Sequence, residues 1–167
     1  MTARLVKTEQ DGYALVSRQV VKDFRFDLAF KQGEECLAPF IKKLNPKLTT
    51  AMAFSPSDPK MPGDCYYEPG YLITNPNAVK DGLAAYSGEG KDTLHVRKIN
   101  AGEWLVFKHV GAYNTLNASW EKAKAEILKA GKQLNCTMDS LPYELYLNDM
   151  SNTPVDQLVT EIWLPIQ

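Results

Sequence analysis

The sequence predicts an α+β fold in which a mostly antiparallel sheet carries two long helices on one side, and three observations support this. First, a segment that begins at Gly12 resembles a second segment that begins at Gly102. Second, each copy is followed by one stretch with helical periodicity and then by two stretches with strand character. Third, helices that lie between runs of strands are typical of α+β proteins. Two strand-strand-helix-strand-strand halves, at about residues 1–80 and 90–167, are expected to form a single domain with a central cleft.

The repeat depends on identical residues at an offset of ninety positions. Gly-Tyr-Ala-Leu-Val-Ser-Arg-Gln-Val aligns with Gly-Glu-Trp-Leu-Val-Phe-Lys-His-Val. The identical pairs are Gly12 with Gly102, Leu15 with Leu105, Val16 with Val106, and Val20 with Val110. A unit of this size buries its apolar face poorly by itself, so we interpret the chain as a duplication in which two copies share one core.

Short apolar or alternating runs predict four strands in each half. They are residues 4–10, 13–21, 49–54 and 66–74, and then 94–99, 103–110, 143–147 and 158–165. Asp11-Gly12 and Ala101-Gly102 suit the turns between the first two strands of each half. Proline, glycine and polar residues predict loops at 55–64 and 148–156, and a connector at 75–92 with a short turn of helix.

One amphipathic helix is predicted in each half. Residues 26–44 carry apolar side chains at helical spacing, namely Phe30, Leu37, Ile41 and Leu44. The second helix has a stripe of Leu116, Trp120, Ala123, Ile127, Ala130 and Leu134. Asp23 or Asp27 is a candidate N-cap for the first helix, which Asn45-Pro46 ends, and Asn114 or Thr115 is a candidate N-cap for the second.

Composition excludes several classes of function. A net charge of −1 offers no basic surface to nucleic acid, and no apolar run approaches the length of a membrane span. Three widely spaced cysteines and the lack of an apolar signal segment predict reduced thiols in the cytoplasm. Neither the cysteines nor His95 and His109 have the spacing of metal ligands, so no metal and no cofactor is expected.

The residues that best suit a site are one acid and several aromatic side chains. Glu144 lies in the apolar strand Leu-Pro-Tyr-Glu-Leu-Tyr-Leu, where it shares a face with Tyr146. Strand pattern alone favours a solvated edge strand, and the alternative is a carboxylate at the floor of an aromatic pocket that suits a lipophilic cation. Trp120 is interpreted as a core residue, and His109 as a hydrogen-bonded structural residue.

The ordered motifs of the second half resemble the GyrI-like small-molecule-binding domain, which is also the effector-binding part of AraC-type and MerR-type multidrug-sensing regulators. They are residues 103–113 with His109-x-Gly111-x-Tyr113, the helix that contains Trp120, the Glu144-x-Tyr146 strand, and the closing residues 160–165. The resemblance covers the whole chain, because the family fold is itself a duplication. The sequence carries no helix-turn-helix domain, and direct binding to nucleic acid is therefore not expected.

The resemblance implies a binding protein for hydrophobic, aromatic and cationic small molecules, with Glu144 as the acid that meets the cation. The expected ligand-binding residues are Glu144, Tyr146, Trp104, Tyr71, Tyr113 and Trp163. Two alternatives stay open. One is a cofactor-independent hydrolase of cyclopropane-type electrophilic toxins, with Glu144, Tyr146 and Tyr113 as catalytic residues. The other is a protein-interaction module whose partner is DNA gyrase or a regulator.

Overall fold

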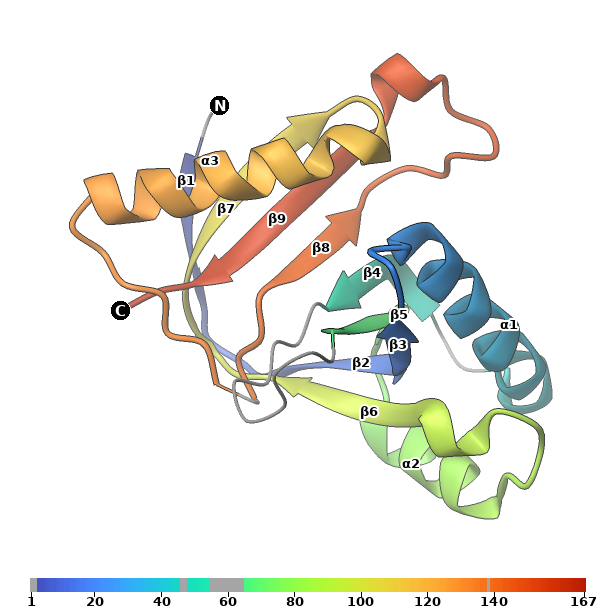
Figure 1. Ribbon diagram of the computed structural model, residues 1–167. Helices are drawn as coiled ribbons and strands as arrows, with labels where there is room; N and C mark the ends of the chain where they lie inside the picture. The colour runs from blue at the N-terminus through green and yellow to red at the C-terminus, as the bar shows by residue number, and fades with distance from the viewer. Residues whose placement is uncertain (1–2, 46–47, 55–64, 138) are drawn as a thin grey trace. The chain divides into compact units, whose positions relative to one another are not determined.

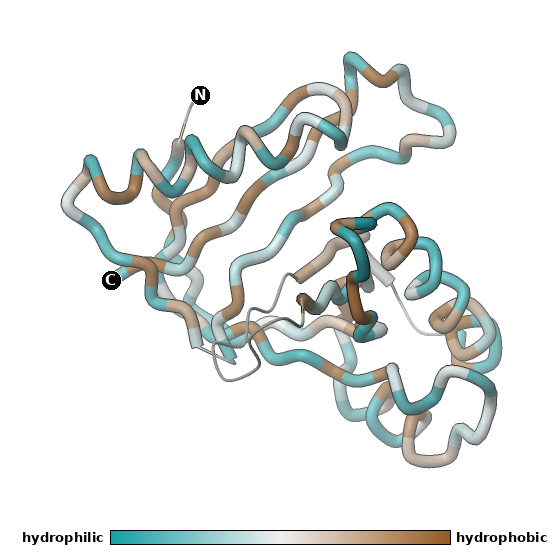
Figure 2. The backbone as a smooth tube through the Cα atoms, viewed as in Figure 1, coloured by the Kyte–Doolittle hydropathy of each residue, from teal (hydrophilic) through white to brown (hydrophobic). Residues whose placement is uncertain are grey.

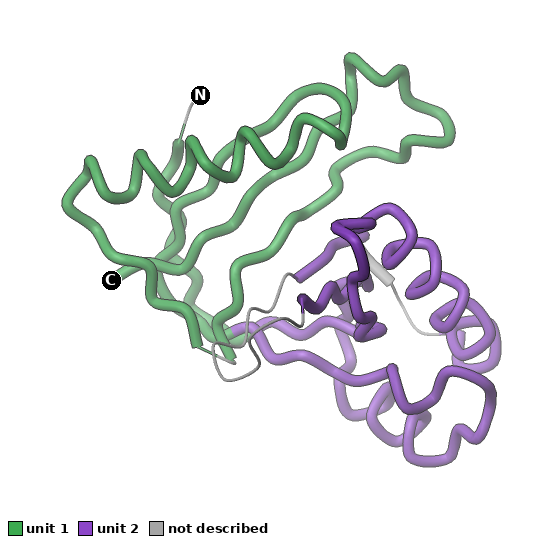
Figure 3. The backbone as a smooth tube through the Cα atoms, in the orientation of Figure 1, with its two compact units in different colours: residues 1–11, 100–167 green, residues 12–99 purple. Residues whose placement is uncertain are grey.

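The computed structural model describes residues 3–45, 48–54, 65–137 and 139–167. In these residues it has nine strands and three α-helices, with every assigned strand pairing antiparallel, so the predicted α+β class is confirmed (Figure 1). The chain divides into two compact units (Figure 3). Unit 1 is Met1–Asp11 with Asn100–Gln167, and unit 2 is Gly12–Ile99. The duplication, the single domain and the central cleft stay predictions.

Unit 1 is a four-stranded sheet with one helix on one face (Figure 1). Its strand order is β1 (Ala3–Thr8), β7 (Gly102–Val110), β9 (Val159–Pro165) and β8 (Tyr143–Tyr146). Helix α3 (Leu116–Lys129) crosses this sheet, and its buried side chains pack on every second residue of β7 and β9. The core of this unit is formed by Phe107, Leu116, Ala123, Ile127, Ile162, Leu164 and Ile166.

Unit 2 contains the remaining strands and two α-helices. Its sheet has the order β4 (Leu48–Phe54), β5 (Cys65–Ile73), β2 (Gly12–Ser17) and β6 (Leu94–Ile99), and β3 (Gln19–Val21) pairs with the other end of β5. Helices α1 (Phe26–Leu44) and α2 (Pro76–Ala85) supply the rest of the core. Buried residues of this core are Leu15, Leu37, Phe40, Ile73, Val79, Tyr86 and Leu94.

The two sheets have corresponding strand orders. Unit 1 reads β1-β7-β9-β8 and unit 2 reads β6-β2-β5-β4. The two orders match when β1, β2, β4 and β5 are taken to correspond to β6, β7, β8 and β9, respectively. β1, the first strand of the first half, belongs to unit 1 with the strands of the second half, and β6 belongs to unit 2 with the strands of the first half.

The long helices follow the predicted periodicity, and hydrophobic and hydrophilic residues alternate along both (Figure 2). Helix α1 has the predicted bounds and ends at Asn45, whose φ of 48° is left-handed. Its N-cap position is Arg25, with no side-chain cap. The predicted cap by Asp23 or Asp27 is therefore wrong, because the Asp27 carboxylate accepts two hydrogen bonds from the Arg25 guanidinium instead.

Helix α3 ends at Lys129, before the predicted Ala130 and Leu134. Gly131 has a φ of 69°, a left-handed conformation that glycine adopts without strain and that commonly ends helices. The N-cap position is Thr115, one of the two predicted residues, but its side chain makes no capping hydrogen bond to the helix.

Other elements also differ from the sequence expectation. The connector holds the ten-residue helix α2, whose N-cap Asn75 accepts a hydrogen bond from the Ala78 N–H over 3.1 Å. The predicted strand 13–21 is divided at Arg18, whose N–H donates to the carbonyl of Thr93. Short 3₁₀ turns occur at Lys91–Thr93, Tyr113–Thr115 and Val155–Gln157. The loop predicted at 55–64 lies outside the described residues.

Candidate functional site

The register of β8 and β9 decides on which face of the unit 1 sheet each candidate lies. Glu144 pairs with Ile162, a core residue beneath α3, and Tyr143 pairs with Trp163. Since neighbouring residues of a strand point to opposite faces, Glu144 lies on the α3 face and Tyr143 with Trp163 on the other. The predicted ligand-binding residues of unit 1 therefore form two groups, one on each face of the sheet.

On the α3 face, Glu144 is surrounded by aromatic side chains. Its Oε1 accepts a hydrogen bond from Trp120 Nε1 over 2.7 Å, and its Oε2 accepts one from the Tyr146 hydroxyl over 2.5 Å. The Tyr113 ring packs edge-on against the Tyr146 ring, with 5.5 Å between their centroids. Glu144 is only 8% exposed, whereas the three aromatic residues are half-buried. We name these four residues the Glu144 cluster.

Negative charge gathers around the Tyr113 end of this cluster. The pKa of the Tyr113 hydroxyl is raised, first by burial and then by the carboxylates of Asp149 and Glu144. Asp149 is exposed, and the N–H of Ser151 donates to its carboxylate and lowers its pKa. Both carboxylates therefore act on the same Tyr113 hydroxyl.

The opposite face of the sheet carries a second acid beside rings. Trp104, Tyr143 and Trp163 pack together there, with Tyr143 and Trp163 stacked at 5.6 Å and 10°. Glu161 accepts hydrogen bonds from Trp163 Nε1 over 2.9 Å and from Arg4 Nη2 over 2.7 Å. Burial raises the pKa of Tyr143 well above its ordinary value, and the nearby Glu161 carboxylate raises it further.

Tyr71 belongs to neither group of unit 1. It lies on β5 of unit 2, against the core beneath α1, and its hydroxyl donates to Glu34 Oε1 over 2.9 Å. The structure thus brings together Glu144, Tyr146 and Tyr113, and separately Trp104 and Trp163, and it describes Tyr71 in the other unit.

His109 has the surroundings of a structural residue, as interpreted from the sequence. Its Nδ1 lies 2.8 Å from the Ser119 hydroxyl at the start of α3, and its Nε2 lies 3.2 Å from the carbonyl of Ala112. Both ring nitrogens of this buried side chain therefore have partners that hold the start of α3 to β7.

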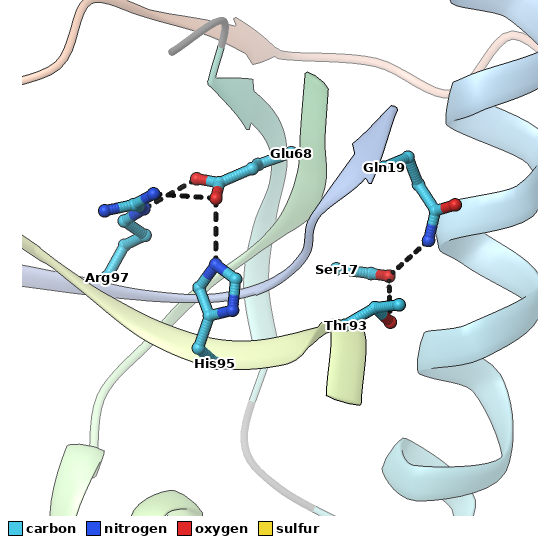
Figure 4. A network of polar contacts seen from close by, with 6 residues as sticks. All are labelled: Ser17, Gln19, Glu68, Thr93, His95 and Arg97. Atoms are coloured by element: carbon cyan, nitrogen blue, oxygen red, sulfur yellow. Dashed lines mark hydrogen bonds and ion pairs between the residues drawn. The ribbon is translucent and has the colours of Figure 1, made fainter. Parts of the chain in front are cut away.

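A buried ion-pair network in unit 2 was not predicted from the sequence (Figure 4). Glu68 is fully buried, and both of its carboxylate oxygens accept hydrogen bonds from Arg97, over 2.6 and 2.7 Å. His95 Nε2 lies 2.8 Å from Oε2 of the same carboxylate. Burial by itself raises the pKa of Glu68, but the hydrogen bonds and charges of His95 and Arg97 outweigh it, and the pKa lies below its ordinary value.

Beside this ion pair, three polar side chains form a short chain of hydrogen bonds (Figure 4). The Ser17 hydroxyl lies 2.8 Å from the Thr93 hydroxyl and accepts a hydrogen bond from Gln19 Nε2. Gln19 also borders a surface hollow of about 500 Å³, whose other lining residues are Gln32, Glu35, Cys36, Pro39 and Glu89. None of the predicted site residues lines this hollow.

Metal ligands and membrane spans were also sought in the described part of the chain. There, no three or more His, Cys, Asp or Glu side chains lie close enough to hold a metal ion. No helix among the same residues is long and apolar enough to cross a membrane. Cys36, Cys65 and Cys136 are free cysteines.

Sequence reasoning missed Trp120 and Glu161 as members of the two groups. Trp120 does pack on the core, as its helical stripe predicts, but its indole N–H also reaches Glu144 across 24 positions of sequence. Glu161 shares a strand face with Trp163 two positions later, which was the available signal. The ion pair to Arg4 spans 157 positions, and no local pattern indicates it.

The fold is that of an α+β domain, and sequence comparison identifies its family. The GyrI-like small molecule binding domain matches residues 34–167. The chain belongs to this family. No curated protein matches the sequence closely enough to count as a relative.

Solved structures with the same fold cover nearly the whole chain. The EcmrR C-terminal domain is 17% identical, with a TM-score of 0.72, and the match covers 99% of this chain and 97% of that one. SAV2435, solved bound to tetraphenylphosphonium, is 16% identical, with a TM-score of 0.65 and coverage of 100% and 94%. A hydrolase from Listeria innocua is 11% identical, with a TM-score of 0.63 and coverage of 99% and 92%. At such identities these likenesses establish the fold.

Proposed function

We propose that this GyrI-like domain binds a hydrophobic aromatic cation at the Glu144 cluster. The observation that carries the proposal is a buried carboxylate whose two oxygens accept hydrogen bonds from the aromatic side chains Trp120 and Tyr146. Aromatic rings around a carboxylate provide apolar contact area and attraction for a cation in the same place.

Charge and exposure support a cationic ligand here. The carboxylates of Glu144 and Asp149 both act on Tyr113, and their attraction for a cation is stronger near a buried site than in bulk water. Half-buried Tyr113, Trp120 and Tyr146 leave ring surface at the boundary with solvent. A ligand with several aromatic rings would cover that surface and bring its charge close to Glu144.

The solved neighbour SAV2435 supplies a suitable probe. Its ligand, tetraphenylphosphonium, carries one positive charge within four phenyl rings, which matches the chemistry of the Glu144 cluster. We expect calorimetric titration of the chain with tetraphenylphosphonium to give saturable binding. Triphenylphosphine oxide, which has similar rings and no net charge, should bind at least roughly tenfold more weakly.

Glu144→Gln is the decisive variant, because it keeps the shape of the side chain and removes its charge. We expect it to weaken tetraphenylphosphonium binding roughly tenfold or more. Glu121→Gln is the matched control, because Glu121 is an exposed acid on α3 whose partner is Lys124. Equal affinities of Glu144→Gln and the parent chain would remove the carboxylate from the site.

A hydrolase function is the second candidate, and one contact favours it. The Tyr146 hydroxyl donates to Glu144 Oε2, so a phenol and a carboxylate stand in position to exchange a proton. Two solved neighbours from Listeria innocua carry the name hydrolase. The test is incubation of the chain with a cyclopropane-bearing alkylating compound and mass spectrometry of the products. Turnover that Glu144→Ala abolishes would favour the enzyme, and a bound but unchanged compound would favour the binding protein.

A further inference from the structure

An aromatic ring is held out in solvent just before α1 of unit 2. Phe24 is 88% exposed, more than any other large apolar side chain of the described residues. It and its neighbour Asp23 both have a left-handed backbone, with φ of 56° and 53°. Two such residues in succession, neither of them glycine, are unusual and persist only where the surrounding structure imposes them. The Arg25 N–H closes this turn by donating to the Lys22 carbonyl over 3.0 Å, and the fold thereby fixes Phe24 in its exposed position.

Two surface hollows lie beside α1, next to this turn. The smaller one, of about 100 Å³, is lined by Val20, Lys22, Arg25, Leu28, Ala29 and Gln32. The larger one is the hollow of about 500 Å³ described above, which is lined by residues of α1 from Gln32 to Pro39 and by Gln19 and Glu89. Gln32 borders both hollows, so they form one continuous surface along the helix. We name this surface the α1 groove.

The two ends of the α1 groove carry opposite charge. Lys22 and Arg25 line the end next to Phe24, whereas Glu35 and Glu89 line the other end. Arg25 donates two hydrogen bonds to the carboxylate of Asp27, so Lys22 supplies most of the positive charge of its end. A surface with one positive and one negative end is complementary to a copy of itself that runs in the opposite direction.

The spacing of residues along α1 also suits such a copy, because the two hollows extend about equally far from Gln32. Leu28 lies four positions before Gln32 and Cys36 lies four positions after it, and Arg25 and Pro39 lie seven positions before and after it. At a rise of about 1.5 Å per residue, these distances along the helix axis are about 6 and about 10 Å. Two antiparallel α1 helices related by a two-fold axis at Gln32 therefore place the smaller hollow of one copy over the larger hollow of the other.

We propose that the α1 groove is the interface of a homodimer, in which Phe24 of each copy enters the larger hollow of the other. Lys22 of one copy then lies against Glu35 and Glu89 of the other, and the two-fold axis repeats every contact. A second copy is the partner that fits, because one surface carries both the protruding ring and the hollow that receives it. This interface goes beyond the proposed function, since it lies in unit 2 and needs no ligand.

Analytical ultracentrifugation of the whole chain tests the interface. Such a small interface predicts a dissociation constant of about 10 to 100 µM, so the average mass should rise from one chain towards two between about 1 µM and 1 mM. Phe24→Ser removes the ring and should weaken association roughly tenfold or more. Leu128→Ser is the matched control, since Leu128 is 75% exposed on α3 of unit 1, and it should leave the dissociation constant unchanged.

An exchange of charges tests the antiparallel arrangement. Lys22→Glu and Glu35→Lys each bring like charges together across the proposed interface, and each should weaken association roughly fivefold or more. A chain that carries both substitutions again has opposite charges across the interface, and its dissociation constant should return to within about twofold of the parent value. Lys132→Glu, at an exposed position of unit 1, controls for the change in net charge and should have no effect. Thermal unfolding of each variant shows whether it is folded.

Three results would overturn the dimer. The first is a parent chain that stays monomeric up to about 1 mM, well above the expected dissociation constant. The second is a folded Phe24→Ser chain that associates as tightly as Leu128→Ser. The third is a double charge variant that associates no more tightly than Lys22→Glu or Glu35→Lys alone. Saturable binding of tetraphenylphosphonium by a monomeric chain would leave the Glu144 cluster as proposed, so the two proposals fail separately.

Discussion

The indole nitrogen of Trp120 lies 2.7 Å from the carboxylate of Glu144, and this hydrogen bond joins α3 to strand β8 of unit 1. Glu144 is buried, and the Tyr146 hydroxyl donates to its other oxygen. A residue that looks like a core tryptophan in the sequence therefore also satisfies a buried charge.

Trp120→Phe tests the structural role of this hydrogen bond. The substitution keeps an aromatic ring on the core and removes the N–H donor, so Glu144 loses one partner. We expect the free energy of unfolding to fall by about 1.5 kcal/mol, because hydrogen bonds to charged groups exceed neutral ones in strength. Urea denaturation measures it. Leu128→Ala, on an exposed position of the same helix, should change stability far less, and equal effects would contradict the role given to the indole N–H.

Arg97→Met should be among the most destabilising substitutions in unit 2. It keeps much of the apolar stem and leaves the fully buried Glu68 without its bidentate partner. A loss of about 3–5 kcal/mol is expected. Adding Glu68→Gln should restore a large part of this loss, because the buried charge is then gone. Arg25→Met, at a fully exposed ion pair, should have no measurable effect. A simple sum of the two single effects in the double variant would contradict a coupled pair.

Acid should selectively remove the stabilisation that Glu68 provides. Its pKa lies below the ordinary value in the folded chain, so its contribution is fully present above the ordinary glutamate pKa of about 4.3. As the pH falls through the lower folded value, residue 68 is protonated in both states and the contribution is lost. The difference in unfolding free energy between the parent and Glu68→Gln should therefore be constant just above pH 5 and shrink on acidification. A difference that grows towards lower pH would mean that folding raises the pKa of Glu68 and would contradict this prediction.

Gly33→Ala should destabilise unit 2, although alanine is the better helix former by about 1 kcal/mol. Gly33 lies within α1, and a Cβ at this position would lie 2.2 Å from Cγ of Pro69 on β5. The helix must shift away from the sheet, and overpacking of this kind usually opposes folding by about 1–3 kcal/mol. Thermal unfolding compares this variant with Gly131→Ala, where the space is open and only the left-handed backbone is strained. A more stable Gly33→Ala would contradict the close contact.

Local sequence patterns predicted the elements of the fold well. The apolar spacing in α1 gave both of its ends, and alternation located the strands of both units. The end of α3 was missed because its apolar stripe continues to Leu134, whereas the left-handed Gly131 stops the helix. An apolar stripe shows which residues would face the core if the segment were helical. It does not show where the helix ends, which here is decided by the left-handed conformation of Gly131.

The candidate sites depend on relations between distant segments, which local patterns do not contain. The register that pairs Tyr143 with Trp163 places Glu144 and Trp163 on opposite faces, and a shift by one residue would have reversed this. The partners of Glu68 are 27 and 29 positions away, on a strand that is not its neighbour. The apolar strand around Glu144 made it a candidate and the family resemblance favoured a binding role, but only the three-dimensional structure identifies Trp120 as its partner.

The most direct test of the Glu144 cluster is an NMR titration that follows the three tryptophan indole N–H signals as tetraphenylphosphonium is added. Binding beside Glu144 predicts a saturable shift of the Trp120 signal that disappears in Glu144→Gln. A Trp120 signal that stays unmoved at a concentration that saturates binding in calorimetry would contradict the proposed site.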